Sequence, residues 1–324
     1  MRFPTNWRSQ LLRILGTILA LVLLVYLLSQ QGWTEIKTAF QQIPASSLLL
    51  ALLLTVISRL AIGFRWHSLL RSGGLPVSLG QAMRLTFAGL FANNFLPATI
   101  GGDIVRLAGA IQLKMDGAIA AASLIADRLV GMAGMAMTAP IGLVIVFKTG
   151  IPNGTGATPA FILAALSARF TEPTAARWHQ RAWHKTIELL KRLFAALGRW
   201  WMQPRALLVA LAYSWVNMLG QFGILYVLFR GMDQPVSFWS VAGLYSLVYF
   251  VTLLPISING YGLQELSMTL IFSHYAGVSL ASGITAALVF RSLMILVSLP
   301  GAFFVPGILA GQKKTASTNP QPGD

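Results

Sequence analysis

Seven charged side chains lie within apolar segments of this sequence, where an ordinary globular protein rarely places them. An unpaired charge near the centre of a bilayer costs at least about 2.5–3.5 kcal/mol on insertion scales, so such residues usually pair or face water. An arginine can hold a phosphate with its planar fork of N–H groups. A carboxylate in the same place can position an arginine, bind an amine or carry a coupling proton. The seven residues are Asp103, Asp127, Glu265, Arg59, Arg106, Arg128 and Arg291.

The spacing of these residues indicates how they pair. Asp103 and Arg106 are three positions apart, so a helix would place both side chains on one face. Asp127 and Arg128 are adjacent, which turns them about 100° apart on a helix and predicts different partners. Two interpretations remain open at this point. Either buried ion pairs hold a helix bundle together, or the charges line a polar cavity that receives an anionic headgroup.

A short pattern, L-P-x-[ST]-I-x-G, occurs twice, at 96–102 and again 158 residues later at 254–260. Each copy interrupts an apolar segment and leads into a second, amphipathic one. Proline removes a backbone donor and glycine tolerates unusual backbone angles, so each helix is predicted to stop within the membrane region. A broken backbone at that depth must be buried in protein or line a wet cavity. Helices that open at Gly102 and Gly260 would add aligned N–H donors for an anion.

The motifs and the charged residues together define a predicted headgroup cavity. No catalytic residue, metal ligand set or cofactor is predicted, because the chain has no Cys and its four His are scattered. There is also no G-x-x-x-x-G-K-[ST] loop, so transport would be passive, ion-coupled or powered by a partner. The predicted cavity residues are Asn93, Asn94, Pro97, Gly102, Asp103, Arg106, Asp127, Arg128, Asn259, Gly260, Glu265 and Arg291.

The composition indicates the solvent in which these residues must be positioned. Of 324 residues, 56% are hydrophobic and only 10% are charged, and the mean hydropathy is +0.69. A soluble domain carries about 25% charged residues, so an all-α polytopic membrane protein is predicted. We expect a single transmembrane domain over 1–311, with approximate halves 1–150 and 151–311, and a disordered cytoplasmic tail over 312–324.

The apolar runs predict about six full crossings and two broken or re-entrant helix pairs. Three crossings separate the two motifs, so the motifs enter from opposite faces and form an inverted repeat, the arrangement found around transporter sites. The crossing that ends at 168 has a short apolar core, 159–168, and is predicted to recruit residues from 151 onward. The crossings are 14–28, 48–66, 118–147, 151–168, 205–229 and 283–309, and the broken pairs are 78–113 and 238–275.

Lysine and arginine residues predict the orientation. Alternating crossings place seventeen of the 24 on one face, three on the other (Lys37, Lys148 and Arg230) and four within apolar or motif segments. This bias predicts cytoplasmic N- and C-termini, and it explains the net charge of +15 better than nucleic-acid binding does. The seventeen are Arg2, Arg8, Arg13, Arg65, Arg71, Arg84, Lys114, the eight from Arg169 to Arg205, Lys313 and Lys314.

A basic amphipathic helix is predicted over 172–201. Its apolar residues recur mostly at three- and four-residue steps, with lysines and arginines between them. Such a helix lies on the headgroup layer of the cytoplasmic leaflet, where anionic lipids attract it. It could serve only to anchor the loop, or it could gate the protein or recruit lipid.

Taken together, these motifs resemble those of a flippase-like family, the transmembrane region of lysylphosphatidylglycerol synthases and their stand-alone relatives. The resemblance runs from about Leu11 to Leu309, with Asp127 where relatives often have Glu. It implies an integral protein of the bacterial inner membrane associated with phospholipids or polyprenyl-linked lipids. The synthases continue into an aminoacyl-transferase domain, and this chain ends at Asp324, so lysyl-lipid synthesis is not implied. The motifs are N-x-x-x-P from Asn93, G-D-x-x-R from Gly102, Asp127-Arg128, L-P-x-S-x-x-G-x-G-x-x-E from Leu254, and Arg291.

Three functions remain open from the sequence. The first is a lipid flippase-like transporter that binds an anionic headgroup through Arg106, Arg128 and Arg291. The second is a non-transporting accessory subunit of an envelope lipid or glycosyltransferase pathway, with an enzyme partner docked on the basic helix. The third is an intramembrane lipid transferase with Asp103 or Glu265 as general base, although no further catalytic group accompanies either residue.

Overall fold

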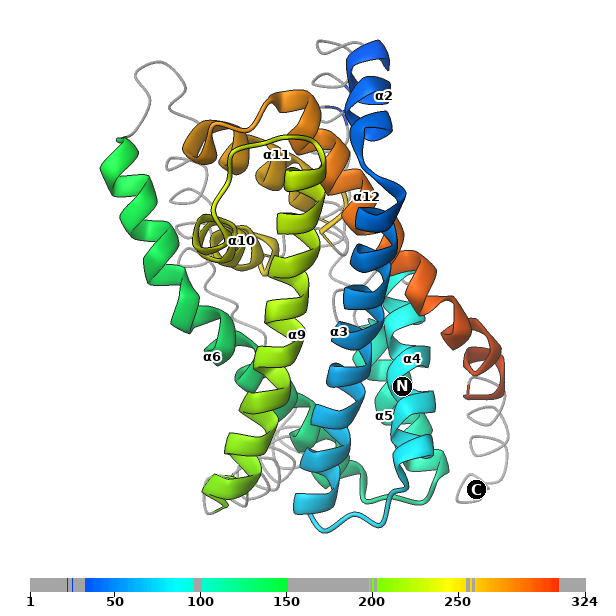
Figure 1. The fold of residues 1–324 in the computed structure, drawn as a ribbon. Helices are drawn as coiled ribbons and strands as arrows, with labels where there is room; N and C mark the ends of the chain where they lie inside the picture. The colour runs from blue at the N-terminus through cyan, green and yellow to red at the C-terminus, as the bar shows by residue number, and fades with distance from the viewer. Residues whose placement is uncertain are drawn as a thin grey trace, which may run out of the picture. The chain divides into compact units, whose positions relative to one another are not determined.

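The computed structural model describes residues 33–95, 101–150, 203–254 and 260–308, together with residues 22, 25, 198, 200 and 257. Throughout these residues the regular secondary structure is helical, with no strand (Figure 1). This confirms the predicted all-α class. The elements are α2 (Trp33–Gln42), α3 (Ala45–Ser72), α4 (Leu79–Phe95), α5 (Gly101–Gln112), α6 (Gly117–Thr149), α9 (Pro204–Gly231), α10 (Phe238–Thr252), α11 (Leu263–Ala276), α12 (Leu280–Ser298) and the 3₁₀ helix η2 (Leu299–Phe303).

Four of these helical segments are long and apolar enough to cross a membrane: α3, α6, α9 and the segment Leu280–Phe303. The 28 residues of α3 extend about 42 Å at 1.5 Å per residue, more than the roughly 30 Å of a hydrocarbon core. They correspond to four of the predicted crossings. The crossings predicted at 14–28 and 151–168, the helix predicted over 172–201 and the tail lie outside the described residues, apart from residues 22, 25, 198 and 200.

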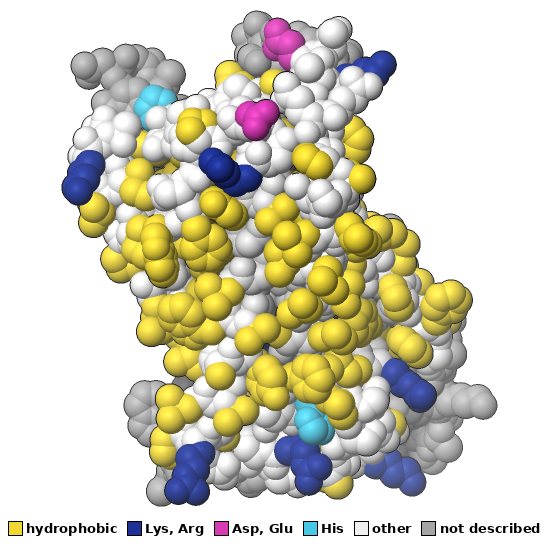
Figure 2. Space-filling model, viewed as in Figure 1, with side chains coloured by type: hydrophobic (Ala, Val, Ile, Leu, Met, Phe, Trp, Pro, Cys, Tyr) yellow, Lys and Arg dark blue, Asp and Glu magenta, His cyan; other side chains and the backbone are white. Residues whose placement is uncertain are grey.

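The surface has the character that a bilayer requires. In Figure 2, hydrophobic side chains gather across the middle of the visible face, and the visible Lys and Arg side chains lie toward its upper and lower ends. Leu49 on α3 is 68% exposed and Phe147 on α6 is 79% exposed. Water would penalise so much exposed apolar surface, whereas lipid does not. Together with the long helices, this surface indicates a polytopic membrane protein.

The chain folds into two compact units, each built from three segments. Unit 1 comprises Met1–Leu54, Met135–Ala176 and Gln221–Leu293, and it contains all of α10 and α11. Unit 2 comprises Thr55–Gly134, Arg177–Gly220 and Met294–Asp324, and it contains all of α4 and α5. Each unit therefore carries one of the two predicted helix breaks. The division into sequence halves at residue 150 stays a prediction.

The break in unit 2 separates α4, which ends at Phe95, from α5, which begins at Gly101. Both ends agree with the predicted interruption at 96–102. The two helices then pack against each other with very little between them. A methyl group added at Gly102 would lie 2.2 Å from the Gly89 carbonyl oxygen, so the close approach of α4 and α5 requires glycine at position 102.

The break in unit 1 separates α10, which ends at Thr252, from α11, which begins at Leu263. Gly260 and Gly262 in the connection have φ of +72° and +74°, a backbone region that residues with a side chain rarely adopt. The predicted interruption at 254–260 is therefore confirmed in this unit as well. Two features of the sequence account for the break. Proline has no backbone N–H, so Pro255 cannot donate a helical hydrogen bond, and the two glycines that follow adopt a positive φ.

Two elements differ from the predictions. Residues 33–42 form helix α2, where the sequence predicts no element between the crossings at 14–28 and 48–66. The last crossing, predicted as continuous from 283 to 309, changes to the 3₁₀ helix η2 at Leu299. Pro300 stands within the first two positions of η2 and has no N–H with which to continue the α-helical hydrogen bonds.

Small residues allow α6 and α10 to approach closely within unit 1. The hydroxyls of Thr138 and Ser246 are hydrogen-bonded at 2.6 Å. One turn further along α6, a methyl group at Gly142 would lie 2.3 Å from the Gly243 carbonyl oxygen. In lipid, where no hydrophobic force drives helices together, such close backbone packing and interhelical hydrogen bonds stabilise the contact.

Replacing Gly142 with alanine is therefore expected to destabilise the protein by about 1–3 kcal/mol, because the added methyl group must push the two backbones apart. Gly80→Ala is the matched control, since an added methyl group there meets no atom within 4 Å. Thermal unfolding of both variants in the same detergent measures the difference. Equal midpoints for the two variants would contradict this packing argument.

Candidate functional site

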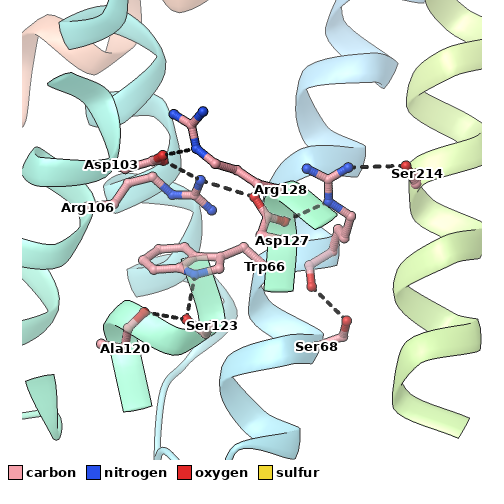
Figure 3. Close-up of polar contacts among 10 residues, drawn as sticks. Trp66, Ser68, Asp103, Arg106, Ala120, Ser123, Asp127, Arg128 and Ser214 are labelled. Atoms are coloured by element: carbon pink, nitrogen blue, oxygen red, sulfur yellow. Dashed lines mark hydrogen bonds and ion pairs between the residues drawn. The ribbon is translucent and has the colours of Figure 1, made fainter. Parts of the chain in front are cut away.

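Five charged side chains form a single cluster in unit 2 (Figure 3). They come from three helices: one from α3, two from α5 and two from α6. The cluster consists of Arg65, Asp103, Arg106, Asp127 and Arg128. We call it the arginine–aspartate cluster.

Asp127 is the buried centre of this cluster. Its Oδ1 accepts a hydrogen bond from Arg65 Nε at 2.6 Å, and its Oδ2 accepts one from Arg106 Nη1 at 3.2 Å. Asp127 is 3% exposed, and each of the two arginines is 7% exposed. A carboxylate between two guanidinium groups in a low dielectric is held strongly, and removing it would leave two buried cations facing each other.

Asp103 connects the remaining members. Its Oδ1 lies 3.4 Å from Arg106 Nη1, and its Oδ2 accepts a hydrogen bond from Arg128 Nε at 2.5 Å. The predicted pairing of Asp103 with Arg106 on one helix face is thereby confirmed. The prediction that Asp127 and Arg128 have different partners is also confirmed. Arg128 is the most accessible member, with 43% of its side chain exposed.

An aromatic ring supports the guanidinium of Arg106. Its Cζ lies 4.1 Å from the centroid of the Trp66 ring, within the range of a cation–π interaction. The indole of Trp66 donates to Ser123 Oγ on α6 at 3.0 Å, and that hydroxyl donates to the Ala120 carbonyl at 2.7 Å. Figure 3 shows the ring lying beneath Arg106. Trp66 therefore fixes the plane of the guanidinium.

The cluster has more positive charge than negative. Three arginines and two aspartates give it a net charge of 3 − 2 = +1. Within the described part of the chain, the buried Nε and Nη2 of Arg106 have no hydrogen-bond partner, because the two aspartates both contact Nη1. Nε and Nη2 form the side-on edge through which an arginine binds a phosphate or a carboxylate bidentately. This arrangement suits a monoanionic oxyanion.

Asn93 and Asn94, predicted as headgroup ligands, make contacts that shape the break. Asn93 Oδ1 accepts a hydrogen bond from the backbone N–H of Gly102 at 2.7 Å, so it satisfies a donor at the start of α5. Asn94 Nδ2 donates to Ser298 Oγ, at the end of α12, at 2.7 Å. One of the N–H groups expected to face an anion is thus already used within the protein.

A second, smaller ion pair lies in unit 1. Arg291 Nε on α12 donates to Glu265 Oε1 at 2.5 Å. Arg291 Nη2 also lies 3.3 Å from the Gly260 carbonyl oxygen, and its Cζ lies 4.7 Å from the centroid of the Tyr261 ring. Glu265 stands in the first turn of α11 and is 4% exposed. The predicted residues Gly260, Glu265 and Arg291 are thus brought together around the break.

Comparison with known proteins assigns the chain to a family. A model of the lysylphosphatidylglycerol synthase transmembrane region matches residues 13–301. The chain belongs to this family. It also resembles a UPF0104 membrane protein of Pyrococcus horikoshii, with 30% identity over 128 residues. That alignment covers 38% of this chain and 36% of the relative's own length. Membership of the family, together with the apolar helices, establishes a multi-pass membrane protein.

The sequence prediction missed two residues of this site, Arg65 in the cluster and Trp66 beside it. Arg65 was counted among the seventeen positive charges of the cytoplasmic face, and its side chain is buried against Asp127. The side of the membrane on which it lies stays a prediction. The sequence predicts Trp66 only as the last residue of the crossing 48–66. Nothing in the local sequence separates it from an ordinary interfacial aromatic residue.

The remaining predicted residues take other positions. Pro97 and Asn259 lie outside the described residues. Gly102 serves the close contact with α4. Arg59, which the sequence placed within a crossing, contacts the sulfur of Met294 in unit 2. No group of three His, Asp or Glu side chains that could hold a metal ion occurs in the part of the chain that the structure describes.

Proposed function

We propose that this member of the family is a flippase-like transporter that moves a lipid with an anionic headgroup across the bacterial cytoplasmic membrane. The headgroup phosphate binds to the arginine–aspartate cluster of unit 2, and the acyl or polyprenyl tails remain in the surrounding lipid. The charge bias of the sequence supports cytoplasmic N- and C-termini.

The free side-on edge of Arg106 is the observation that carries this proposal. Burying a guanidinium is costly unless its N–H groups are satisfied, and a purely structural ion pair would be expected to use them. Here two of the three nitrogen atoms make no hydrogen bond to a described residue, in a cluster with a net charge of +1. One phosphodiester carries one negative charge and would neutralise the cluster while using both nitrogens.

The two helix breaks support transport rather than binding alone. In each unit, the first turn after the break carries a carboxylate, which accepts a hydrogen bond from an arginine Nε on the following helix. The sequence separations of these pairs are 25 residues for Asp103 and Arg128, and 26 for Glu265 and Arg291. We take the two regions as the halves of an inverted repeat, an architecture in which broken helices bind the substrate of a transporter.

Lipid exchange in vesicles tests this function. Purified protein is reconstituted with fluorescent phosphatidylglycerol or a fluorescent polyprenyl phosphate, and a membrane-impermeant reductant then reports the fraction of probe in the outer leaflet. We expect the native protein to exchange at least one probe faster than protein-free vesicles do. Arg128→Gln is expected to slow exchange several-fold, because the most accessible cation of the cluster is lost.

Arg230→Gln is the matched control, since Arg230 is an exposed arginine in the last turn of α9. It is expected to exchange lipid at the native rate. Native exchange by Arg128→Gln in protein that elutes as a single folded species would contradict the proposal.

A further inference from the structure

The Glu265–Arg291 pair of unit 1 differs from the arginine–aspartate cluster in its charge. One carboxylate and one guanidinium make the pair neutral, whereas the cluster in unit 2 carries +1. An anion that binds to Arg291 while Glu265 is ionised would therefore leave a net negative charge in an apolar environment. The anion and the carboxylate compete for the same guanidinium, so Arg291 becomes available only when Glu265 loses its charge.

One carboxylate oxygen of Glu265 is in a position to receive a proton. Oε1 accepts the hydrogen bond from Arg291 Nε, but the buried Oε2 has no hydrogen-bond partner among the residues that the structure describes. Thr269 lies one turn further along the same helix, and its buried Oγ1 likewise lacks a described partner. The two atoms make no hydrogen bond to each other, so the hydroxyl does not compensate the charge on Oε2. Protonation of Oε2 would therefore remove an uncompensated buried charge without breaking a described hydrogen bond.

The guanidinium of Arg291 remains positioned when its ionic partner is neutralised. It still stacks on Tyr261 at 4.7 Å, and Nη2 still reaches the Gly260 carbonyl at 3.3 Å. Both contacts act on an uncharged ring or a backbone dipole, and neither depends on the carboxylate charge. Neutral Glu265 would therefore leave a cation that is held in place, with its Nε free to contact an oxyanion.

We propose that Glu265 carries the coupling proton of lipid transport, and that its protonation releases Arg291 to bind the headgroup phosphate. The inference rests on the proposed function and adds its energy source. A proton from water on one side forms an O–H bond at Oε2, and the ionic contact of Oε1 with Arg291 weakens. When the headgroup leaves, the proton departs to water on the other side and the ion pair forms again.

Few other titratable groups accompany this pair. On the helices that meet around it, Arg291 is the sole charged partner of Glu265 in the described structure. His274 and Tyr275 stand nine and ten residues further along α11, about 13 Å or more along its axis. The titratable groups on α10, α11, α12, the connection before α11 and the unit 1 part of α9, which packs against α11, are Tyr226, Arg230, Tyr245, Tyr249, Tyr261, Glu265, His274, Tyr275 and Arg291.

A pH difference across the vesicle membrane tests the proposal. Vesicles with fluorescent phosphatidylglycerol are prepared with the interior one pH unit more acidic or more alkaline than the exterior, and the steady-state leaflet distribution is measured. One pH unit corresponds to a factor of ten, so coupling of one proton to one lipid gives an asymmetry of up to about tenfold. We expect the native protein to produce this asymmetry and to invert it when the gradient is reversed. Protein-free vesicles correct for spontaneous redistribution.

Two glutamate variants separate coupling from transport. Glu265→Gln, which resembles the protonated side chain, is expected to lose the dependence of the leaflet distribution on the gradient. Glu35→Gln changes an exposed glutamate on α2 and is expected to match the native protein.

Two outcomes overturn the coupling while lipid transport stands. One is rapid exchange by the native protein with an even distribution under both gradients, a measurement that needs no variant. The other is native asymmetry in Glu265→Gln. Failure of the native protein to exchange any probe would instead remove the transport function, and the coupling with it.

Discussion

Replacing Asp127 with asparagine is expected to destabilise the folded protein by about 3–5 kcal/mol, the cost of removing one partner from a buried ion pair. Arg65 and Arg106 would then face each other with no carboxylate between them, and the charge of the cluster would rise from +1 to +2. An asparagine could still accept from Arg65 through Oδ1, but its NH₂ group would point a donor at Arg106. Thermal or chemical unfolding in one detergent measures the loss.

Asp233→Asn is the control for this effect. Asp233 is exposed and has a left-handed φ of +53°, which asparagine also tolerates, so this variant is expected to unfold like the native protein. Combining Asp127→Leu with Arg65→Met tests the electrostatic cause, because it restores the charge of the cluster to +1. We expect the double variant to recover much of the lost stability. A double variant as unstable as Asp127→Asn would show that shape, and not charge, dominates the site.

Local periodicity was sufficient to predict part of this cluster. Asp103 and Arg106 pair because a helix places positions three apart on one face, and Asp127 and Arg128 diverge because adjacent helical positions point apart. The relative directions of these side chains depend only on helix geometry, and the apolar pattern of the sequence already predicts helices at these positions. The two helix breaks followed in the same way from the chemistry of proline and glycine, and α4 and α10 end close to the expected positions.

Tertiary packing determines the rest, and the sequence has no local signal for it. Arg65 and Asp127 are 62 residues apart, and an arginine near the end of a crossing has the same appearance as one that obeys the positive-inside rule. Trp66 becomes a platform for Arg106 only because α3, α5 and α6 meet around it. Asn93 lies next to a predicted anion site but reaches across the break to the Gly102 N–H. The local pattern does not specify this contact.

The contrast between the two charged groups has a consequence for function. The arginine–aspartate cluster is cationic in the described structure and needs no proton before it accepts an anion, whereas the Glu265–Arg291 pair is balanced. Changes in the arginine–aspartate cluster are therefore expected to affect lipid movement at every pH gradient. The change at Glu265 is expected to remove the response to the gradient. This difference allows binding and coupling to be examined with separate variants.

Arg106→Lys is expected to slow lipid exchange about ten- to a hundredfold, which corresponds to the roughly 1.5–3 kcal/mol of a hydrogen bond to a charged group. Lysine keeps the positive charge, so ion pairs with Asp103 and Asp127 can still form and the protein should fold. It lacks the planar edge made by Nε and Nη2, and as a compact ammonium it cannot grip a phosphate bidentately while it contacts both carboxylates. Exchange of fluorescent phosphatidylglycerol, with unfolding midpoints measured on the same samples, tests both statements.

The two readouts for Arg106→Lys distinguish an anion site from a structural ion pair. If Arg106 serves only to neutralise the aspartates, lysine should support native exchange and should cost at most stability. If its side-on edge holds the headgroup, exchange should fall while the unfolding midpoint stays close to that of the native protein. Trp66→Phe removes the indole hydrogen bond to Ser123 but leaves a ring under the guanidinium, so it is expected to slow exchange less than Arg106→Lys does. Native exchange by Arg106→Lys would therefore remove the main support for a headgroup site in unit 2, because the free edge of Arg106 would then have no role in lipid movement.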